Sequence, residues 1–262
     1  MKHSLYKIYE FVSGQLGIDI LKLIKFPRGF LYYVIDFFHF KSKYNGKYSF
    51  RPCLHDKFDE SGSVRTEYFW QDLLIAQEIF KNRPANHLDI GSRIDGFVTN
   101  VASFMPIEVF DIRSLNLNIP NITFTQMDLM STSQLSNFVQ SYDSVSCLHT
   151  LEHFGLGRYG DLIDIDGYIK GFTNISSLVS SGGNMYFSTP IGKEIVEFNA
   201  NRIFNPNTIL KLANENDLEV IKMLTISSGY KVKSINLKDF KNEIELLSKQ
   251  RYNLGIFIFK KR

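Results

Sequence analysis

The sequence has only two cysteines, and this scarcity excludes several classes of protein. Cys53 and Cys147 stand alone in the 262-residue chain, so they cannot build a disulfide framework, and their separation does not fit a metal-binding cysteine pair. The N-terminus also lacks the continuous apolar segment and the small-residue cleavage site of a secretory signal peptide. Together these absences favour a cytoplasmic protein.

Long apolar runs and a strong charge imbalance are also missing. The longest aromatic-rich run, residues 26–40, is interrupted by Pro27, Arg28 and Asp36, so it is too short and too polar to span a bilayer. The net charge of +3 is too small to indicate nucleic-acid binding. The charge is uneven, however, because residues 1–50 carry eight Lys/Arg and only three Asp/Glu.

Residues 1–64 are predicted to form a helical, basic and aromatic-rich extension. Apolar residues recur with a helical period over 4–24, Pro27 and Gly29 are expected to end that helix, and a second, aromatic helix is expected over 30–40. The sequence leaves three interpretations of this extension open. It is a helical cap over an active site, the surface of a homodimer, or an interfacial anchor that makes a peripheral membrane contact.

From residue 65 the pattern becomes that of an α/β domain, which we expect to extend over 65–262. After a helix at about 67–80, short apolar segments alternate with helical stretches, which is typical of a parallel sheet with crossover helices. The expected strands are 86–90, 107–111, 122–127, 144–148, 184–188, 218–225 and 255–259, with helices at 96–104, 166–180 and 206–216. We therefore predict a Rossmann-like sheet of seven strands.

Acidic residues and a glycine mark the ends of the first three strands, where ligands bind to such a sheet. Asp89 and Gly91 end the first strand, Asp111 ends the second, and Asp128 follows the third. Asp111 can accept from both ribose hydroxyls of a bound adenosine, and Asp128 can accept from an adenine amino group, with Leu129 beside the ring. Each acid alone fits a solvated loop residue equally well. Their occurrence at three successive strand ends is what indicates an adenosine site.

The loop after the first strand departs from the G-x-G-x-x-G pattern of dinucleotide sites. It runs Gly91-Ser92-Arg93-Ile94-Asp95-Gly96, and Asp95 would face a pyrophosphate. S-adenosylmethionine has no phosphate and carries a sulfonium cation, so it tolerates this acid better. The loop therefore favours the methyl donor over NAD.

Two histidines follow the fourth strand. Residues 149–153 formally match the H-x-x-E-H pattern of zinc peptidases, which needs both histidines on one face of a helix. Here they straddle a strand–loop–helix junction, so we predict no metal site and keep a zinc hydrolase as an alternative. Histidine titrates near neutrality and can take a proton from a hydroxyl acceptor. His149 and His153 are therefore candidate general bases, followed by Asp161 and Tyr159.

Candidate acceptor-binding residues follow the fourth and fifth strands. Tyr159 belongs here too, and Arg158 and Arg202 can orient an acceptor that is already ionised and needs no base. Asn199 and Asn201 offer hydrogen-bond donors and acceptors to sugar hydroxyls, and Pro190 is expected beside the same crevice. Each also fits a bland role: a solvated loop charge for the arginines, and turn formation for the asparagines.

Six segments between residues 65 and 206 carry a family resemblance. They are FWQDL at 69–73, HLDIGSRIDG at 87–96, DIR at 111–113, LEHFGLGRYGD at 151–161, TPIG at 189–192 and FNANR at 198–202. The strand order and the acids resemble class I S-adenosylmethionine-dependent methyltransferases. The segments more narrowly resemble the DUF268 proteins, several of which lie among bacterial surface-polysaccharide genes.

The resemblance implies S-adenosylmethionine as the cofactor and a methyl acceptor of the sugar, nucleotide-sugar or phosphate type, in capsule or surface-polysaccharide synthesis. The cofactor-binding residues it implies are Asp89, Gly91, Ser92, Arg93, Asp111, Ile112, Arg113, Asp128, Leu129 and His149. The usual glycine loop of methyltransferases is reduced here to Gly91 and Gly96, so Arg93 is expected to hold the methionine carboxylate. A non-catalytic binding or scaffold protein that keeps the fold is the alternative.

Overall fold

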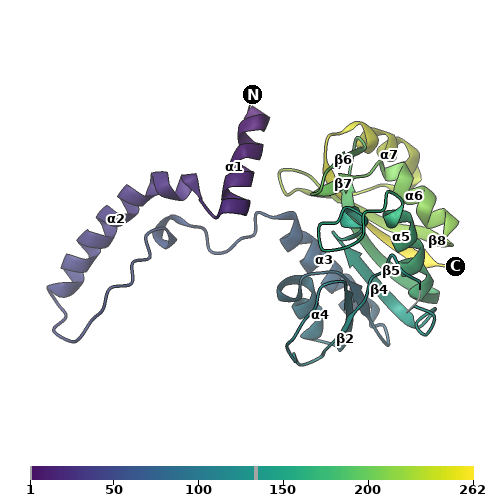
Figure 1. Ribbon diagram of the computed structural model, residues 1–262, viewed down its shortest axis with the longest axis horizontal. Coiled ribbons are helices and arrows are strands. Elements are labelled where there is room, and N and C mark those ends of the chain that lie inside the picture. Colours follow the sequence, from purple (N-terminus) through teal and green to yellow (C-terminus); the bar gives the residue numbers. More distant parts are fainter. Residues whose placement is uncertain (1, 133–134) are drawn as a thin grey trace. The chain divides into compact units, whose positions relative to one another are not determined.

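The computed structural model describes residues 2–132 and 135–262, which fall into two compact units, Met1–Ser63 and Val64–Arg262 (Figure 1). The first unit holds two helices and an irregular segment, and the second holds the sheet. Among the described residues, no helix combines the length and the apolar character needed to cross a membrane.

The first unit contains helices α1 (Lys2–Leu16) and α2 (Ile20–Lys41). The break between them lies at Gly17, whose φ of +70° is left-handed, and the carboxylate of Asp19 caps α2 by accepting from two backbone N–H groups. The prediction that Pro27 and Gly29 end a helix is therefore wrong. Gly29 serves a close approach instead, because a Cβ there would lie 2.1 Å from the carbonyl oxygen of Leu54.

The second unit begins with helix α3 (Glu67–Asn82). The Thr66 hydroxyl caps its first turn by accepting from the Phe69 N–H, and the left-handed Arg83, at φ 45°, ends it. This helix was predicted, and its first two turns face the functional site described below.

The sheet of the second unit has eight strands in the order β3-β2-β1-β4-β5-β10-β8-β9. The strands are β1 (Leu88–Ile90), β2 (Ile107–Asp111), β3 (Ile122–Gln126), β4 (Tyr142–Leu148), β5 (Val179–Ile191), β8 (Leu218–Ile226), β9 (Val232–Ser234) and β10 (Asn253–Lys261). The first five run parallel, and β10 lies antiparallel between β5 and β8. All seven predicted strands are present, and the Rossmann-like α/β architecture is confirmed.

Some elements were not predicted, and the strands β4, β5 and β10 were predicted too short. The new elements are β9, the hairpin of β6 (Ile195–Glu197) and β7 (Asn201–Ile203), and helix α7 (Phe240–Lys249). The other helices are α4 (Thr99–Ala102), α5 (Gly167–Leu178) and α6 (Pro206–Glu215). Strand β5 runs to residue 191, because its last residues continue to pair with β10.

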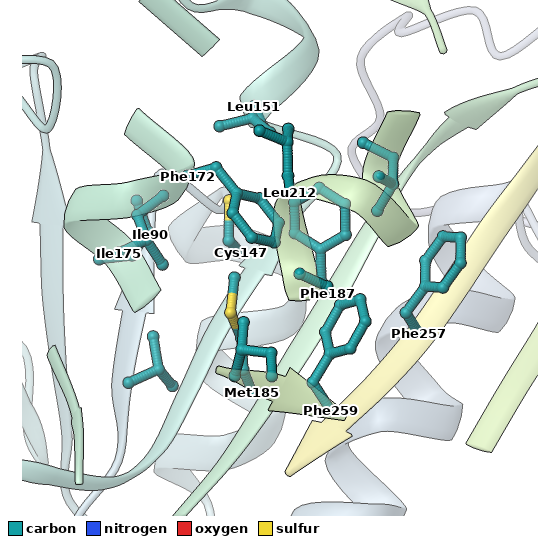
Figure 2. Packing of buried hydrophobic residues seen from close by; sticks show 14 of the residues in the cluster. Ile90, Cys147, Leu151, Phe172, Ile175, Met185, Phe187, Leu212, Phe257 and Phe259 are labelled. Carbon is teal, nitrogen blue, oxygen red and sulfur yellow. The ribbon is translucent and has the colours of Figure 1, made fainter. Parts of the chain in front are cut away.

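Apolar side chains cover both faces of the sheet, which makes three layers. On one face the buried cluster includes Phe172 from α5, Leu212 from α6 and Phe187 from β5, and Figure 2 shows these side chains packed together. On the other face Ile75 and Ile79 of α3 pack with strand residues. Because helices cover both faces, the ligand-accessible part of this sheet is the edge where the parallel strands end.

Candidate functional site

A cavity of about 530 Å³ lies at the carboxyl ends of β1, β2, β3 and β4. The strand register explains why it forms there: Ile90 pairs with Phe110 and Asp111 with Gln126, so the residues that follow these strands gather at one edge. Ile90 and Phe110 themselves line its floor.

Asp111, Ile112, Asp128 and Leu129 line the cavity from the β2 and β3 side, where the sequence predicted an adenosine site. Asp111 is only 7% exposed, and Arg113 occupies it. The Arg113 side chain donates from Nε to Oδ1 at 2.9 Å and from Nη2 to Oδ2 at 2.5 Å, and its backbone N–H also donates to Oδ1. Since a carboxylate has about four lone-pair sites, one site on Oδ2 stays open while Arg113 is in place. Two ribose hydroxyls fit only if Arg113 moves.

Gly91 also lines the cavity, and its position requires glycine. Its φ is +71°, and a Cβ there would lie 2.4 Å from Cγ2 of Thr150. The backbone can therefore approach a ligand at the end of β1 without a side chain in the way.

Asp89, Ser92 and Arg93, three of the predicted cofactor contacts, are not among the residues that line the cavity. Asp89 is fully buried and accepts from the Ser92 N–H, the Ser92 hydroxyl and the Ser146 hydroxyl, so it holds the β1 loop in shape. Burial raises the pKa of Asp89 to about 7. Arg93 is exposed, and its guanidinium makes two hydrogen bonds to Asp95, at 2.9 and 2.6 Å. Arg93, the predicted carboxylate clamp, is therefore engaged with Asp95 and is not among the residues that line the cavity.

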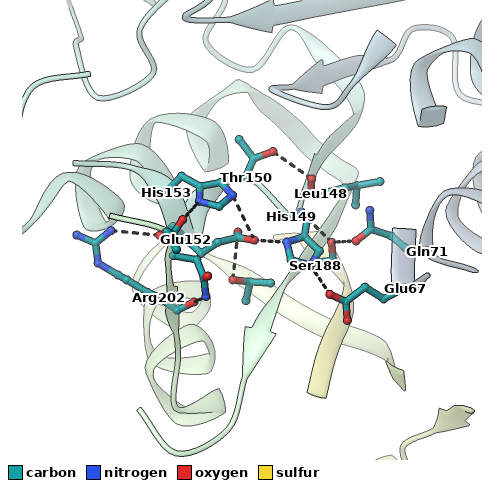
Figure 3. A network of polar contacts seen from close by, with 12 residues as sticks. Glu67, Gln71, Leu148, His149, Thr150, Glu152, His153, Ser188 and Arg202 are labelled. Carbon is teal, nitrogen blue, oxygen red and sulfur yellow. Dashed lines mark hydrogen bonds and ion pairs between the residues drawn. The ribbon is translucent and has the colours of Figure 1, made fainter. Parts of the chain in front are cut away.

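His149 lines the cavity and lies between two carboxylates (Figure 3). Its Nδ1 contacts Glu152, and its Nε2 lies 3.1 Å from Oε1 of Glu67. Burial by itself lowers the pKa of His149, but the two carboxylates outweigh burial and raise this pKa to about 10. At neutral pH the ring is therefore an imidazolium that donates through both nitrogens. It has no lone pair to take a proton, which argues against its predicted role as a general base.

His153 also lines the cavity, in a different protonation state. Burial lowers its pKa, so the ring is neutral at pH 7. Its Nδ1 lies 2.7 Å from the carbonyl oxygen of Ala200, which can only accept, and 3.3 Å from Nη1 of Arg158, which can only donate; the shorter contact places the proton on Nδ1. The lone pair is then on Nε2, which lies 4.0 Å from Oε1 of Glu152. This is the arrangement expected of a general base whose protonated form a nearby carboxylate stabilises.

The segment after His153 forms a loop at the mouth of the cavity, to which Tyr159 and Asp161 contribute lining. The Asp161 carboxylate accepts one backbone N–H on each oxygen, from Gly157 and Tyr159, so it shapes the loop and keeps a lone pair on each oxygen. The Tyr159 ring lies beneath two guanidiniums, that of Arg113 at 4.8 Å and that of Arg158 at 5.2 Å. These stacked cations give the mouth of the cavity a positive side.

Four predicted acceptor residues lie elsewhere. Arg202 is buried and donates to backbone carbonyls of the 152–165 segment, including that of Phe154 at 2.5 Å, so it holds this loop in place. Pro190 is buried within β5 and pairs with β10. Asn199 and Asn201 belong to the β6–β7 hairpin, which reaches the site through the Ala200 carbonyl and not through its amide side chains.

Sequence reasoning missed the residues that hold His149. Glu67 and Gln71 come from α3, and Tyr252 directly precedes β10; the Tyr252 hydroxyl donates to Glu67. The Ser188 hydroxyl donates to Gln71 and accepts from the His149 N–H (Figure 3). Glu67 lies 82 positions from His149 in the chain, and no spacing pattern in the sequence connects them.

Three side chains of the site also offer ligand atoms to a metal ion. One atom each from His149, Glu152 and His153 lies within 4.8 Å of the others. The two histidines are joined by a single helical turn, Leu151–His153, after β4, as the predicted strand–loop–helix junction implied. The proton between His149 and Glu152 already balances the charge of the Glu152 carboxylate. The cluster therefore fits either this proton or a metal ion in its place.

The pKa of His149 makes the stability of the protein depend on pH. The pKa of His149 in the folded protein, about 10, is above the ordinary value of 6.5. The protonated ring therefore contributes its full share to the free energy of unfolding below pH 6.5, and this contribution is lost as the pH rises toward 10. We expect urea unfolding between pH 6.5 and 10 to show a steeper loss of stability for the wild type than for His149→Gln, by roughly 1 kcal/mol per pH unit. Parallel stability curves for the two proteins would mean that His149 is not a buried imidazolium.

Solved structures share this fold at low sequence identity. An N1-methyltransferase of Burkholderia thailandensis, with 1,6-didemethyltoxoflavin and S-adenosylhomocysteine bound, is 11% identical over 76% of this chain and 79% of its own, with a TM-score of 0.52. The O-methyltransferase of a Brevibacillus brevis trans-AT polyketide synthase, in complex with S-adenosylhomocysteine, is 16% identical over 74% and 72%, with the same TM-score. The [4+2]-cyclase SpnF is 12% identical over 72% and 81%, with a TM-score of 0.50. The fold is thus that of class I methyltransferases.

Sequence comparison gives the family. No curated protein matches the sequence. Residues 106–256, more than half of the chain, match the family described as "Caenorhabditis protein of unknown function, DUF268". This description names no bacterial surface-polysaccharide genes, so that part of the predicted context has no support from it. The chain belongs to the DUF268 family.

Proposed function

We propose that this protein is an S-adenosylmethionine-dependent methyltransferase. The observation that carries the proposal is that Gly91, Asp111 and Asp128, from three successive strand ends, line one cavity of about 530 Å³. The complexes of two structural neighbours with S-adenosylhomocysteine add support. Asp128 keeps an acceptor for the adenine amino group, because among the described residues only Met130 donates a backbone N–H to its carboxylate, at Oδ1.

The cavity suggests how the donor lies. We place the adenine ring between Ile112 and Leu129, with its amino group at Asp128, and the ribose at Asp111 after Arg113 has moved. The methionine end then lies near Gly91 and Thr150, both of which line the cavity. For Arg93 to hold the methionine carboxylate, its guanidinium would have to leave Asp95.

For the acceptor we propose a sugar, nucleotide-sugar or phosphate-type molecule that is methylated on oxygen. The acceptor oxygen forms a bond to the methyl carbon as the sulfonium C–S bond breaks, and a hydroxyl acceptor passes its proton to Nε2 of His153. Arg113 and Arg158, whose guanidiniums both lie against the Tyr159 ring, provide positive charge for a phosphate group near the reacting oxygen. Capsule or surface-polysaccharide synthesis and a cytoplasmic location are consistent with this chemistry and remain part of the proposal.

Substitution of Asp111 tests the donor site. We expect Asp111→Asn to weaken S-adenosylmethionine binding by roughly 10- to 100-fold, because hydrogen bonds to a charged acceptor are worth about 1.5–3 kcal/mol. Asp143→Asn, an identical change at the opposite end of the same sheet, is the control and should bind as the wild type does. Titration calorimetry measures both. No heat and no thermal stabilisation of the wild type at millimolar cofactor would contradict the proposed function.

Substitution of His153 separates catalysis from binding. Transfer of a radioactive methyl group to a panel of sugar phosphates and nucleotide sugars should fall roughly 10²- to 10⁴-fold in His153→Gln. Cofactor affinity should stay near that of the wild type. If the wild type binds the cofactor but methylates no acceptor, and His153→Gln leaves the cellular function unchanged, the non-catalytic alternative holds.

Metal-dependent hydrolysis is the second candidate, and the convergence of His149, Glu152 and His153 favours it. The structurally similar [4+2]-cyclase SpnF illustrates that a protein with this fold need not carry the name of a methyltransferase. Elemental analysis of the purified protein decides between the two. We expect methyl transfer to survive treatment with a chelator, whereas one bound zinc per chain together with chelator-sensitive hydrolysis would favour the hydrolase.

A further inference from the structure

Helix α2 carries an apolar face that the rest of its own unit leaves uncovered. Because residues three and four apart share a face of a helix, six apolar side chains fall on one side of α2. They are Ile20, Leu23, Ile24, Leu31, Ile35 and Phe38, and their exposed fractions run from 44% to 70%. A contiguous apolar surface of this kind is rare on soluble proteins unless it binds something.

The opposite side of the helix is occupied by the chain that returns along it. Gly29 contacts the Leu54 backbone, the Tyr32 ring packs against Phe58 at 5.6 Å, and Asp36 bonds to Lys57 at 2.8 Å. These three helix residues form one stripe, which lies roughly opposite the apolar face at 100° per residue. The returning segment therefore covers the more polar side of α2 and leaves the apolar face free for another partner.

Positive charge surrounds this face. Residues 17–50 contain six Lys/Arg and two acids. Both acids are engaged, since Asp19 caps the helix and Asp36 pairs with Lys57. At 100° per residue, Arg28 and Lys41 lie at the two borders of the apolar face, whereas Lys22 and Lys25 lie on the opposite side of the helix. A symmetric contact between two copies through this face would bring like charges together, whereas an anionic surface would neutralise them.

We propose that the apolar face of α2 docks on an anionic lipid surface, with the helix lying in the plane of the membrane. An apolar face bordered by basic residues, here Arg28 and Lys41, is typical of interfacial helices, which insert into the headgroup region without crossing the bilayer. This contact is independent of the proposed methyl transfer, because it involves only the first unit. It would bring the protein to acceptors held at a membrane.

Vesicle sedimentation of the full-length protein tests this surface. The protein should sediment with vesicles of phosphatidylcholine and phosphatidylglycerol, and much less with phosphatidylcholine alone or at high salt. Replacing Arg28 and Lys41 together by glutamine should weaken binding roughly 25-fold, since each charge contributes about fivefold. The double change Lys238→Gln and Lys241→Gln, at exposed lysines of the second unit, is the matched control.

The apolar contribution has its own variant. The triple change Ile24→Ser, Leu31→Ser and Phe38→Ser should lower binding more than roughly 100-fold. Leu117→Ser, Ile221→Ser and Leu246→Ser remove three exposed apolar side chains from the second unit and should leave binding unchanged. Helix content by circular dichroism confirms that each variant is folded.

Two results would overturn the proposal. One is the absence of sedimentation with anionic vesicles at millimolar lipid. The other is a dimer in sedimentation equilibrium that the triple apolar variant dissociates, which would assign the face to a second copy of the chain. Cofactor calorimetry on the same preparations keeps these outcomes separate from any failure of the proposed methyltransferase activity.

Discussion

The buried charges around His149 connect elements that are far apart in the sequence. Glu67 begins α3, His149 follows β4, Glu152 lies in the turn after it, and Tyr252 precedes β10. Removing one member would leave an uncompensated charge in a site that excludes water, which is far more costly than losing a surface ion pair. The position of α3 and the shape of the loop that carries His153 therefore both depend on this network.

The same network divides two similar histidines into different roles. His149 is enclosed by two carboxylates, and these raise its pKa until it is a fixed cation. His153 bonds to a neutral carbonyl and lies near only one carboxylate, so burial prevails and its pKa falls. One buried residue, Glu152, thus fixes His149 and leaves His153 able to accept a proton. Residue type alone could not distinguish the two, because the difference lies in partners distant in sequence.

The sequence predicted the sheet and one side of the cavity, because both follow from local patterns. Strand ends can be located from hydrophobic periodicity, and parallel strands bring their ends together, so Gly91, Asp111 and Asp128 were found. Asp89 was misassigned because its hydroxyl partners turn it into the interior. Arg202 was misassigned because a loop arginine and a buried backbone clamp look alike in sequence. Helix α2 passes through Pro27 because contacts with residues 54–58, invisible to local propensity, stabilise it.

Asp111 is paired with Arg113. The central prediction about the site is therefore that the methyl donor displaces the Arg113 guanidinium when its ribose binds Asp111. A crystal structure of the protein with S-adenosylhomocysteine tests it most directly. The account predicts both ribose hydroxyls on Asp111, the adenine amino group on Asp128, and the Arg113 guanidinium moved away from Asp111. A ligand bound elsewhere, or one bound here while Arg113 keeps all its bonds to Asp111, would contradict it.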